Sequence, residues 1–228
     1  MVMVKSAPKR LGILGGTFDP VHLGHLAVAR VALDALALDQ LLFIPSSKPP
    51  HKVERTVAPF ADRLAMLKRA LADRPQFAVS ALEGERQDLS YSIDTLKELR
   101  ARLGEDTALF FVMGLDAFVE MATWKNFRDI PRFADIVVVN RPQARQQSMA
   151  AAVHHIFGVQ GGVSQVGPGL WQLAGNGHIR QLVMDEVPVS STAVRRALAQ
   201  GEDVSAMLPP EVMAYIREHG LYQGGDRG

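Results

Sequence analysis

The stretch LGILGGTFDPVHLGH, residues 11–25, decides the fold class, because it combines a short strand, a glycine turn and the start of a helix. Leu11–Leu14 is an apolar run of the length expected for a strand that is buried on both faces. Gly15 and Gly16 follow it, and apolar residues at helical spacing begin at Leu26. Glycines after a strand let the backbone approach a ligand, and a helix N-terminus offers N–H groups and a positive dipole end. The stretch therefore predicts a phosphate-binding turn between a strand and a helix.

The same alternation of strand and helix continues along the chain, with Gly and Pro between the segments. It predicts an α/β fold with a doubly wound parallel sheet. The expected strands are Leu11–Leu14, Leu41–Ile44, Phe77–Ser80, Leu109–Met113, Ile136–Val139 and Ile179–Met184. The expected helices are Leu26–Leu38, Phe60–Leu71, Ile93–Leu103, Leu115–Met121, Thr192–Ala199 and Pro210–His219.

The 228 residues, of which 47% are hydrophobic, are enough for one sizeable core, so a single domain is expected. Residues 10–189 would form the α/β core and residues 190–222 a short C-terminal helical part. The stretch Gln143–Gly177 is rich in Gly, Gln, Ala and His. It is expected to be a variable or partly mobile excursion on the same domain.

Charge and cysteine content exclude several classes of function. The formal net charge is +1, so no global field would hold a nucleic acid or an anionic membrane, and neither partner is expected. The chain has no cysteine, which rules out disulfides and thiolate catalysis. No signal peptide and no run of 18 apolar residues is present, so a soluble cytoplasmic protein is expected.

His22 and His25 stand three residues apart at the expected helix start, with Gly24 between them. At this spacing both rings can face one phosphate and donate to its oxygens, which suits phosphoryl or nucleotidyl transfer. One alternative is an ordinary strand-to-helix turn whose histidines cap the helix. A zinc site is disfavoured, because no third ligand follows at a suitable spacing, and no metal ligands are assigned.

A second candidate phosphate site is the stretch VSSTAVR, residues 189–195, at another helix start. Ser191 and Thr192 offer hydroxyls and N–H groups there, and Arg195 lies one turn further on, where it can fork onto phosphate oxygens. The alternative is an ordinary Ser/Thr cap with a solvated arginine.

The third candidate is the loop PSSKPPHK, residues 45–52, which follows the second strand. Its prolines limit its conformations, so Lys48, His51 and Lys52 would lose less entropy when they bind an anion. The alternative is a solvated basic loop.

The first two motifs resemble those of the HxGH nucleotidylyltransferase superfamily, which shares its histidine motif with class I aminoacyl-tRNA synthetases. The resemblance rests on GTFDP at 16–20, HLGH at 22–25 and VSSTAVR at 189–195, where the family's ISSTxxR motif usually begins with Ile. It implies a Rossmann-like nucleotidylyltransferase fold whose two motifs bind ATP and its triphosphate. The implied catalytic residues are His22, His25 and Arg195, and the implied ATP-binding residues are Gly15, Gly16, Thr17, Phe18, Gly24, Ser191 and Thr192.

The third loop resembles that of nicotinate mononucleotide adenylyltransferases, as do SYS at 90–92, where the family usually has SYT, GLD at 114–116 and TW at 123–124. The resemblance covers Leu11 to about Pro142 and about Ile179 to Tyr222. It implies that Trp124 stacks on a pyridine ring and that Asp116 accepts hydrogen bonds from a ribose. Two alternatives stay open, in which Trp124 covers a hydrophobic edge and Asp116 caps a helix. The implied acceptor-binding residues are Lys48, His51, Lys52, Tyr91, Ser92, Gly114, Asp116 and Trp124.

The expected activity is therefore adenylyl transfer from ATP to nicotinate mononucleotide, giving deamido-NAD and pyrophosphate. Mg²⁺ is expected to arrive with the triphosphate, without dedicated protein ligands. The alternatives are another acceptor, such as nicotinamide mononucleotide, phosphopantetheine or glycerol phosphate, an RNA-binding relative of the synthetases, and a catalytically silent nucleotide sensor. The oligomeric state cannot be derived from these patterns.

Overall fold

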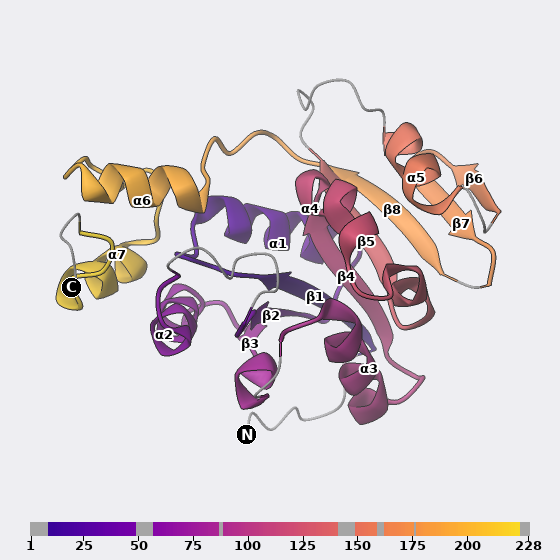
Figure 1. Ribbon diagram of the computed structural model, residues 1–228, viewed down its shortest axis with the longest axis horizontal. Coiled ribbons are helices and arrows are strands. Elements are labelled where there is room, and N and C mark those ends of the chain that lie inside the picture. The colour runs from indigo at the N-terminus through magenta and orange to yellow at the C-terminus, as the bar shows by residue number, and fades with distance from the viewer. Residues whose placement is uncertain are drawn as a thin grey trace.

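The computed structural model describes residues 9–48, 57–86, 89–140, 149–158, 162–175 and 177–223. In these ranges the chain forms one eight-stranded sheet with the order β3-β2-β1-β4-β5-β8-β7-β6. Figure 1 shows this sheet with β3 near its lower left and β6 at its far right. The strands are β1 (Arg10–Gly16), β2 (Gln40–Pro45), β3 (Phe77–Val79), β4 (Ala108–Gly114), β5 (Asp135–Asn140), β6 (Val163–Gly167), β7 (Leu170–Leu173) and β8 (His178–Val183).

All six expected strands and all six expected helices are present, with bounds that differ by a few residues. The largest difference is at α1, which begins at Leu23 with His22 as its N-cap, three residues earlier than expected. The α-helices are α1 (Leu23–Ala35), α2 (Phe60–Ala70), α3 (Ser92–Leu103), α4 (Leu115–Glu120), α5 (Met149–Phe157), α6 (Ser191–Ala199) and α7 (Pro210–Glu218). The 3₁₀ helices are η2 (Leu82–Glu85), η3 (Met121–Thr123) and η4 (Phe127–Arg132).

The strand order changes direction at β1, and this change positions the functional site. The strands β2 and β3 lie on one side of β1, whereas β4 and β5 lie on the other, and all of these pairs are parallel. Open α/β sheets bind ligands outside the carboxyl ends of the strands at such a switch point. The carboxyl ends of β1 and β4 are Gly16 and Gly114, so the candidate glycines of two motifs meet there.

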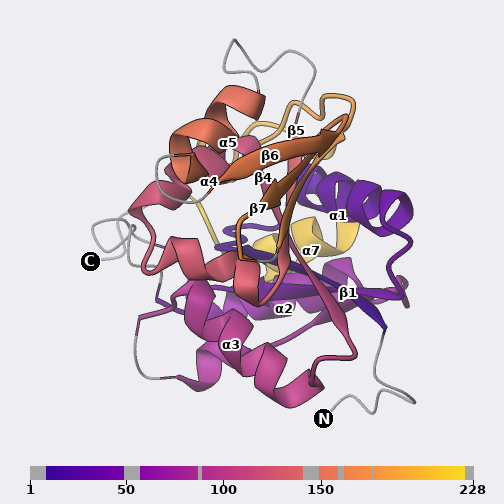
Figure 2. The same cartoon turned by 90° about the vertical axis from the view of Figure 1, so that its right-hand side faces the viewer.

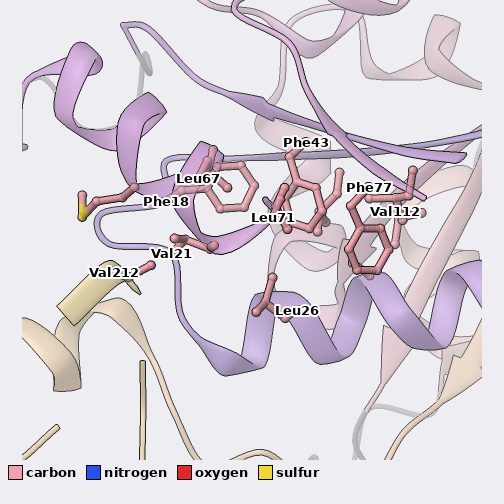
Figure 3. Packing of buried hydrophobic residues seen from close by; sticks show 14 of the residues in the cluster. Phe18, Val21, Leu26, Phe43, Leu67, Leu71, Phe77, Val112 and Val212 are labelled. Carbon is pink, nitrogen blue, oxygen red and sulfur yellow. The ribbon is translucent and has the colours of Figure 1, made fainter. Parts of the chain in front are cut away.

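Helices cover both faces of the sheet, because successive strand residues point to opposite sides. In β4, Phe110 and Val112 belong to a buried cluster that also includes residues of α1, α2, α6 and α7, and Figure 3 shows part of this cluster. Phe111 and Met113 face the other way and pack with α3, α4 and α5. Both faces are therefore apolar, as expected for a central parallel strand.

The expectation for residues 143–177 needs correction, since it foresaw neither a helix nor strands there. The described part contains α5 and a hairpin of β6 and β7, which extends the sheet antiparallel beyond β8. Figure 2 brings this hairpin and α5 to the front. The sheet is therefore mixed rather than wholly parallel. In α5, Ala152, Val153 and Ile156 are buried at helical spacing, which is why this Ala- and His-rich segment is ordered against the sheet.

No helix in the described ranges is both long and apolar enough to cross a membrane.

Candidate active site

The connection from β1 to α1 contains the first motif and is shaped by a buried phenylalanine. Phe18 has a φ of 50°, is 1% exposed and places its ring over the backbone of Gly16. A Cβ atom at Gly16 would lie 3.1 Å from that ring, so a glycine suits this position. The Phe18 ring also meets the edge of the His25 ring, with centroids 4.9 Å apart. The Phe18 side chain therefore packs against both the glycine turn and the His25 ring.

The two histidines of the motif lie together at the N-terminus of α1. Their rings stack with centroids 3.7 Å apart, and the backbone N–H of His22 donates to Nδ1 of His25 over 3.2 Å. Since Nδ1 accepts, a neutral His25 has its proton on Nε2, which makes Nε2 a donor. Gly24 leaves room for this pair, because a Cβ atom there would lie 3.1 Å from the His22 ring.

The second motif lies directly beside the first, although the chain positions are far apart. The hydroxyl of Ser191 donates to the carbonyl oxygen of Pro20 over 3.0 Å, across 171 positions of the sequence. Nη1 of Arg195 donates to the carbonyl oxygen of Asp19 and lies 3.4 Å from its carboxylate. Two helix N-termini, those of α1 and α6, therefore meet at one place, and Ser190 caps α6 through the N–H of Ala193.

A cavity of about 270 Å³ opens on one side of the first motif, between the ends of β1 and β4. Tyr91, the N-cap of α3, and Ser92, its first residue, line it together with Trp124. Trp124 is half-buried and meets Phe111 edge-on, with centroids 6.3 Å apart, so one part of its ring packs on the sheet. Lys125, which the sequence did not single out, also lines this cavity and pairs with Asp94 at 3.0 Å.

A second cavity of about 310 Å³ lies on the other side of the motif and is lined by Gly24, Gly114 and Asp116. The sequence grouped Gly114 and Asp116 with the acceptor loop, but the structure places them here, apart from Trp124. Gly114 is the N-cap of α4, and Asp116 lies in the first turn of this short helix. One stretch, residues 15–24, thus lines both cavities, with Gly15, Gly16 and Thr17 in the first and Gly24 in the second.

The profile of the Cytidylyltransferase-like family matches residues 13–197, a range that spans both motifs. A protein of Solibacter usitatus named "Probable nicotinate-nucleotide adenylyltransferase" is 40% identical over 213 residues, which cover 93% of this chain and 99% of that protein. A protein of Thermus thermophilus with the same name is 38% identical over 214 residues, which cover 94% of this chain and all of that protein. The chain belongs to the nicotinate-nucleotide adenylyltransferase family. The resemblance of its motifs is thereby confirmed.

Solved structures with the same fold include two of a Plasmodium falciparum nicotinic acid mononucleotide adenylyltransferase. The complex with APC has a TM-score of 0.66 at 15% identity, and the complex with NaAD has 0.67 at 14%. Each covers 94% of this chain and 97% of the solved one. These likenesses confirm the Rossmann-like fold of this nicotinate-nucleotide adenylyltransferase family member.

The loop that follows β2 in this family member is described only in part. His51 and Lys52 lie outside the described residues. Lys48 is exposed and does not line the cavity beside Trp124, but its backbone joins this loop to α3. Its carbonyl oxygen accepts from the N–H of Ser90 over 3.1 Å, and the N–H groups of Ser47 and Lys48 donate to Oγ of Ser90 over 3.1 and 3.3 Å.

Glu83 is a buried carboxyl that the sequence reasoning missed, although it lines the cavity beside Trp124. The hydroxyl of Thr95 donates to it over 2.7 Å. Burial raises the pKa of Glu83 above its ordinary value, and the hydrogen bonds of Thr95 and Ser90 together with the charge of Arg86 oppose this shift. The Glu83 carboxyl at the wall of this cavity therefore retains its proton to a higher pH than a solvated glutamate does.

Asp19, the aspartate of GTFDP, and Arg63 were not predicted as site residues, and both are buried. Asp19 accepts hydrogen bonds from the Tyr222 hydroxyl at 2.7 Å and from the N–H of Ala58 at 3.2 Å, in addition to pairing with Arg195. Burial and the negative charge of Asp19 raise the pKa of Tyr222. Helical spacing gives a signal for Arg63, since it shares the buried face of α2 with Met66 and Leu67.

Proposed function

We propose that this chain transfers the adenylyl group of ATP to nicotinate mononucleotide, forming nicotinate adenine dinucleotide and pyrophosphate. The observation that carries the proposal is the position of residues 15–24 between two cavities. Two substrates bound in these cavities would meet at the histidine motif. Membership in the nicotinate-nucleotide adenylyltransferase family supports the same reaction.

In the proposed reaction a phosphate oxygen of the acceptor attacks the α-phosphorus of ATP. The new bond joins this oxygen to the α-phosphorus, while the bond from the α-phosphorus to the bridging oxygen breaks and pyrophosphate leaves with the electron pair. No protein nucleophile is needed. The protein contributes position and donors for the charge that grows on the phosphate oxygens.

The roles follow from the geometry of the two helix starts. Nε2 of His25 donates to the α-phosphate, and His22, stacked beside it, holds its orientation through its backbone N–H. Pyrophosphate leaves toward the N-terminus of α6, where Ser191, Thr192 and Arg195 provide N–H, hydroxyl and guanidinium donors. ATP would place its adenosine in the cavity of Gly24 and Asp116, where the carboxylate can accept from ribose hydroxyls.

The acceptor would occupy the cavity of Trp124, with the pyridine ring stacked on the indole. Helix α3 begins at Ser92, and the first N–H groups of a helix have no carbonyl partner within it. The positive end of the helix dipole lies at the same place. Lys125 adds a cation at the same wall. These groups favour the carboxylate of nicotinate over the neutral amide of nicotinamide.

Mg²⁺ belongs to the proposal as an ion that ATP brings with it. Within the described ranges no group of three His, Cys, Asp or Glu side chains could hold a metal ion. Asp19 offers no preformed site either, since its carboxylate is engaged by Arg195, Tyr222 and Ala58. Phosphate oxygens and water would therefore be its main ligands, and no step of the reaction is assigned to it. A cytoplasmic location, where ATP is available, is part of the same proposal.

The decisive experiment measures pyrophosphate release from ATP with nicotinate mononucleotide and nicotinamide mononucleotide offered in separate reactions. Rapid release with the acid, slower release with the amide and a dinucleotide of matching mass are expected. Absence of turnover with both acceptors would refute the proposal. Faster turnover with the amide would refute the assigned acceptor but leave adenylyl transfer in place.

A further inference from the structure

Arg63 lies in the first turn of α2, is 2% exposed and donates the hydrogen bonds of its guanidinium to backbone carbonyls. Its Nε donates to Ala58 over 2.9 Å. Its Nη1 donates to Thr17 over 2.7 Å and to Ser46 over 2.8 Å, and its Nη2 donates to Ser47 over 3.4 Å. Four of the five N–H donors of a guanidinium are thus occupied by carbonyl oxygens.

These four carbonyls belong to three separate segments, two of which line the proposed acceptor cavity. Thr17 belongs to the turn after β1, and Ser46 and Ser47 form the stem after β2. Ala58 forms the other stem of the same loop, just before α2, so Arg63 binds the chain on both sides of residues 49–56. Thr17 and Ser46 themselves line the acceptor cavity. The guanidinium therefore ties both stems of this loop to the turn after β1.

The N–H groups of the two stems are hydrogen-bonded by residues other than Arg63. The Ser47 N–H donates to Oγ of Ser90, and the Ala58 N–H donates to the carboxylate of Asp19. Ser47 and Ala58 are therefore each hydrogen-bonded through both the carbonyl oxygen and the N–H group. Negative Asp19 also faces the buried guanidinium and compensates part of its charge.

We propose that Arg63 is a positioning residue for adenylyl transfer, which holds both stems of the loop after β2 at a set distance from the turn after β1, where the two substrates would meet. This inference rests on the proposed function, because it needs two substrates that meet across residues 15–24. Displacement of a reacting group by about 1 Å can lower the rate about 10²-fold, so small shifts of these stems matter. A lysine cannot replace this arginine, since a single ammonium cannot reach carbonyls on three segments at once.

The test compares Arg63→Lys with Arg100→Lys, which is a matched control. Arg100 also donates to three carbonyls, those of Gly104, Thr107 and Phe133, each over 2.8 Å. Thr107 and Phe133 precede β4 and β5, so this frame lies at the amino ends of the strands, away from both cavities. Both variants should lose thermal stability, but only one should change the acceptor site.

We expect Arg63→Lys to raise the KM for nicotinate mononucleotide by about tenfold or more and to lower kcat by a similar factor. The Kd of a non-hydrolysable ATP analogue, measured without acceptor, should change by less than about twofold. In Arg100→Lys all three constants should match the wild type. If Arg63→Lys loses stability but keeps the wild-type acceptor KM and kcat, its role is structural and the inference is overturned.

A second variant keeps the inference testable if Arg63→Lys does not fold. Ser90→Ala removes the hydroxyl that accepts from Ser47 and Lys48 and that also hydrogen-bonds Glu83, so it loosens the same stem from its other side. It should also raise the acceptor KM and leave the affinity for the ATP analogue unchanged, and an unchanged acceptor KM would overturn the inference. A wild-type chain without turnover would overturn the proposed function and this inference together, whereas an active wild type with insensitive variants would overturn the inference alone.

Discussion

At the scale of the residue, His25 is the group whose chemistry the structure defines most narrowly. The His22 N–H fixes Nδ1 of His25 as an acceptor, so Nε2 donates. Replacing His25 with Ala should lower kcat by about 10² to 10³, the cost of losing one donor to the transition state. Steady-state pyrophosphate release measures this effect. His155→Ala, at an exposed position of α5, is the control, and a His25→Ala enzyme with most of its turnover would contradict the role.

Trp124 allows a second prediction, which concerns binding rather than rate. Its ring packs edge-on against Phe111, and the residue also lines the proposed acceptor cavity, so the contact with the sheet leaves stacking on a pyridine ring as a prediction. Trp124→Ala should weaken binding of nicotinate mononucleotide by about tenfold, the equivalent of about 1.4 kcal/mol of stacking. Calorimetry gives the affinity directly. Trp124→Phe keeps a ring and should lose less, and equal affinities for all three proteins would exclude stacking.

Single residues also show where sequence reasoning succeeds and fails. The proximity of His22, Gly24 and His25 could be predicted, because contiguous residues at a strand-to-helix junction must share one place. Asp116 lies in a different cavity from Trp124, which the sequence did not predict, because the end of β4 contributes residues to both cavities. Arg63 was overlooked, since an arginine in a helix is ordinarily solvated and its carbonyl partners come from three separate segments.

At the scale of the element, the contact between the start of α1 and the segment before α6 depends on Gly24. A Cβ atom there would lie 3.0 Å from Cγ1 of Val189 and 3.1 Å from the His22 ring. Gly24→Ala should therefore lower the free energy of unfolding by about 1–3 kcal/mol, as overpacking does, and lower kcat by displacing His22. Urea unfolding measures the first effect. Val189→Ala in the same chain should reduce the cost of Gly24→Ala, and strictly additive effects would argue against this contact.

The packing of η2 on α3 makes stability depend on pH through Glu83. Burial raises its pKa above 4.5, its ordinary value, so the folded state keeps a proton that the unfolded state has lost. The stability from this group is complete below the unfolded pKa and is lost as the pH rises through the raised value. The difference in unfolding free energy between the wild type and Glu83→Gln should therefore fall as the pH rises from 4.5.

Glu98 on α3 provides a control of opposite sign. Although burial acts to raise its pKa, the hydrogen bond from Arg86 and the charges of Arg86 and Arg102 hold it below the ordinary value. Stability from Glu98 is thus present above the unfolded pKa and is lost as the pH falls through the lowered value. Urea titrations between pH 3 and pH 8 should show opposite slopes for Glu83→Gln and Glu98→Gln relative to the wild type, and slopes of the same sign would contradict the assigned surroundings.

Elements were predicted best where both faces of a strand are buried. The strands β4 and β5 read as continuous apolar runs, and they lie in the middle of the sheet. The hairpin of β6 and β7 was missed because β6 is an edge strand whose central residues, Ser164, Gln165 and Val166, are exposed. Its sequence therefore lacks the apolar run by which the other strands were recognised.

At the scale of the whole molecule, the class of the sheet could be predicted from the sequence but the order of its strands could not. Alternating strands and helices predicted a doubly wound sheet, but the switch point between β1 and β4 follows from hydrogen bonds between segments that are distant in the chain. The meeting of the two motifs has the same character. Each motif was recognisable by its own residues, whereas the charge network around Asp19 that joins them arises only on folding.

The network around Asp19 also includes Tyr222, which lies near the C-terminal end of the described chain and donates its hydroxyl to the Asp19 carboxylate. Tyr222→Phe removes a hydrogen bond to a buried carboxylate and should cost about 1.5–3 kcal/mol of stability. It should also raise the KM for ATP, since Asp19 orients Arg195. Tyr215→Phe is the matched control, because its hydroxyl donates to Asp62 over 2.8 Å between α7 and α2, away from both cavities. Urea unfolding and ATP kinetics of both variants separate the two roles: if Tyr222→Phe and Tyr215→Phe lose stability and neither changes the KM for ATP, the C-terminal segment anchors the fold without shaping the triphosphate site.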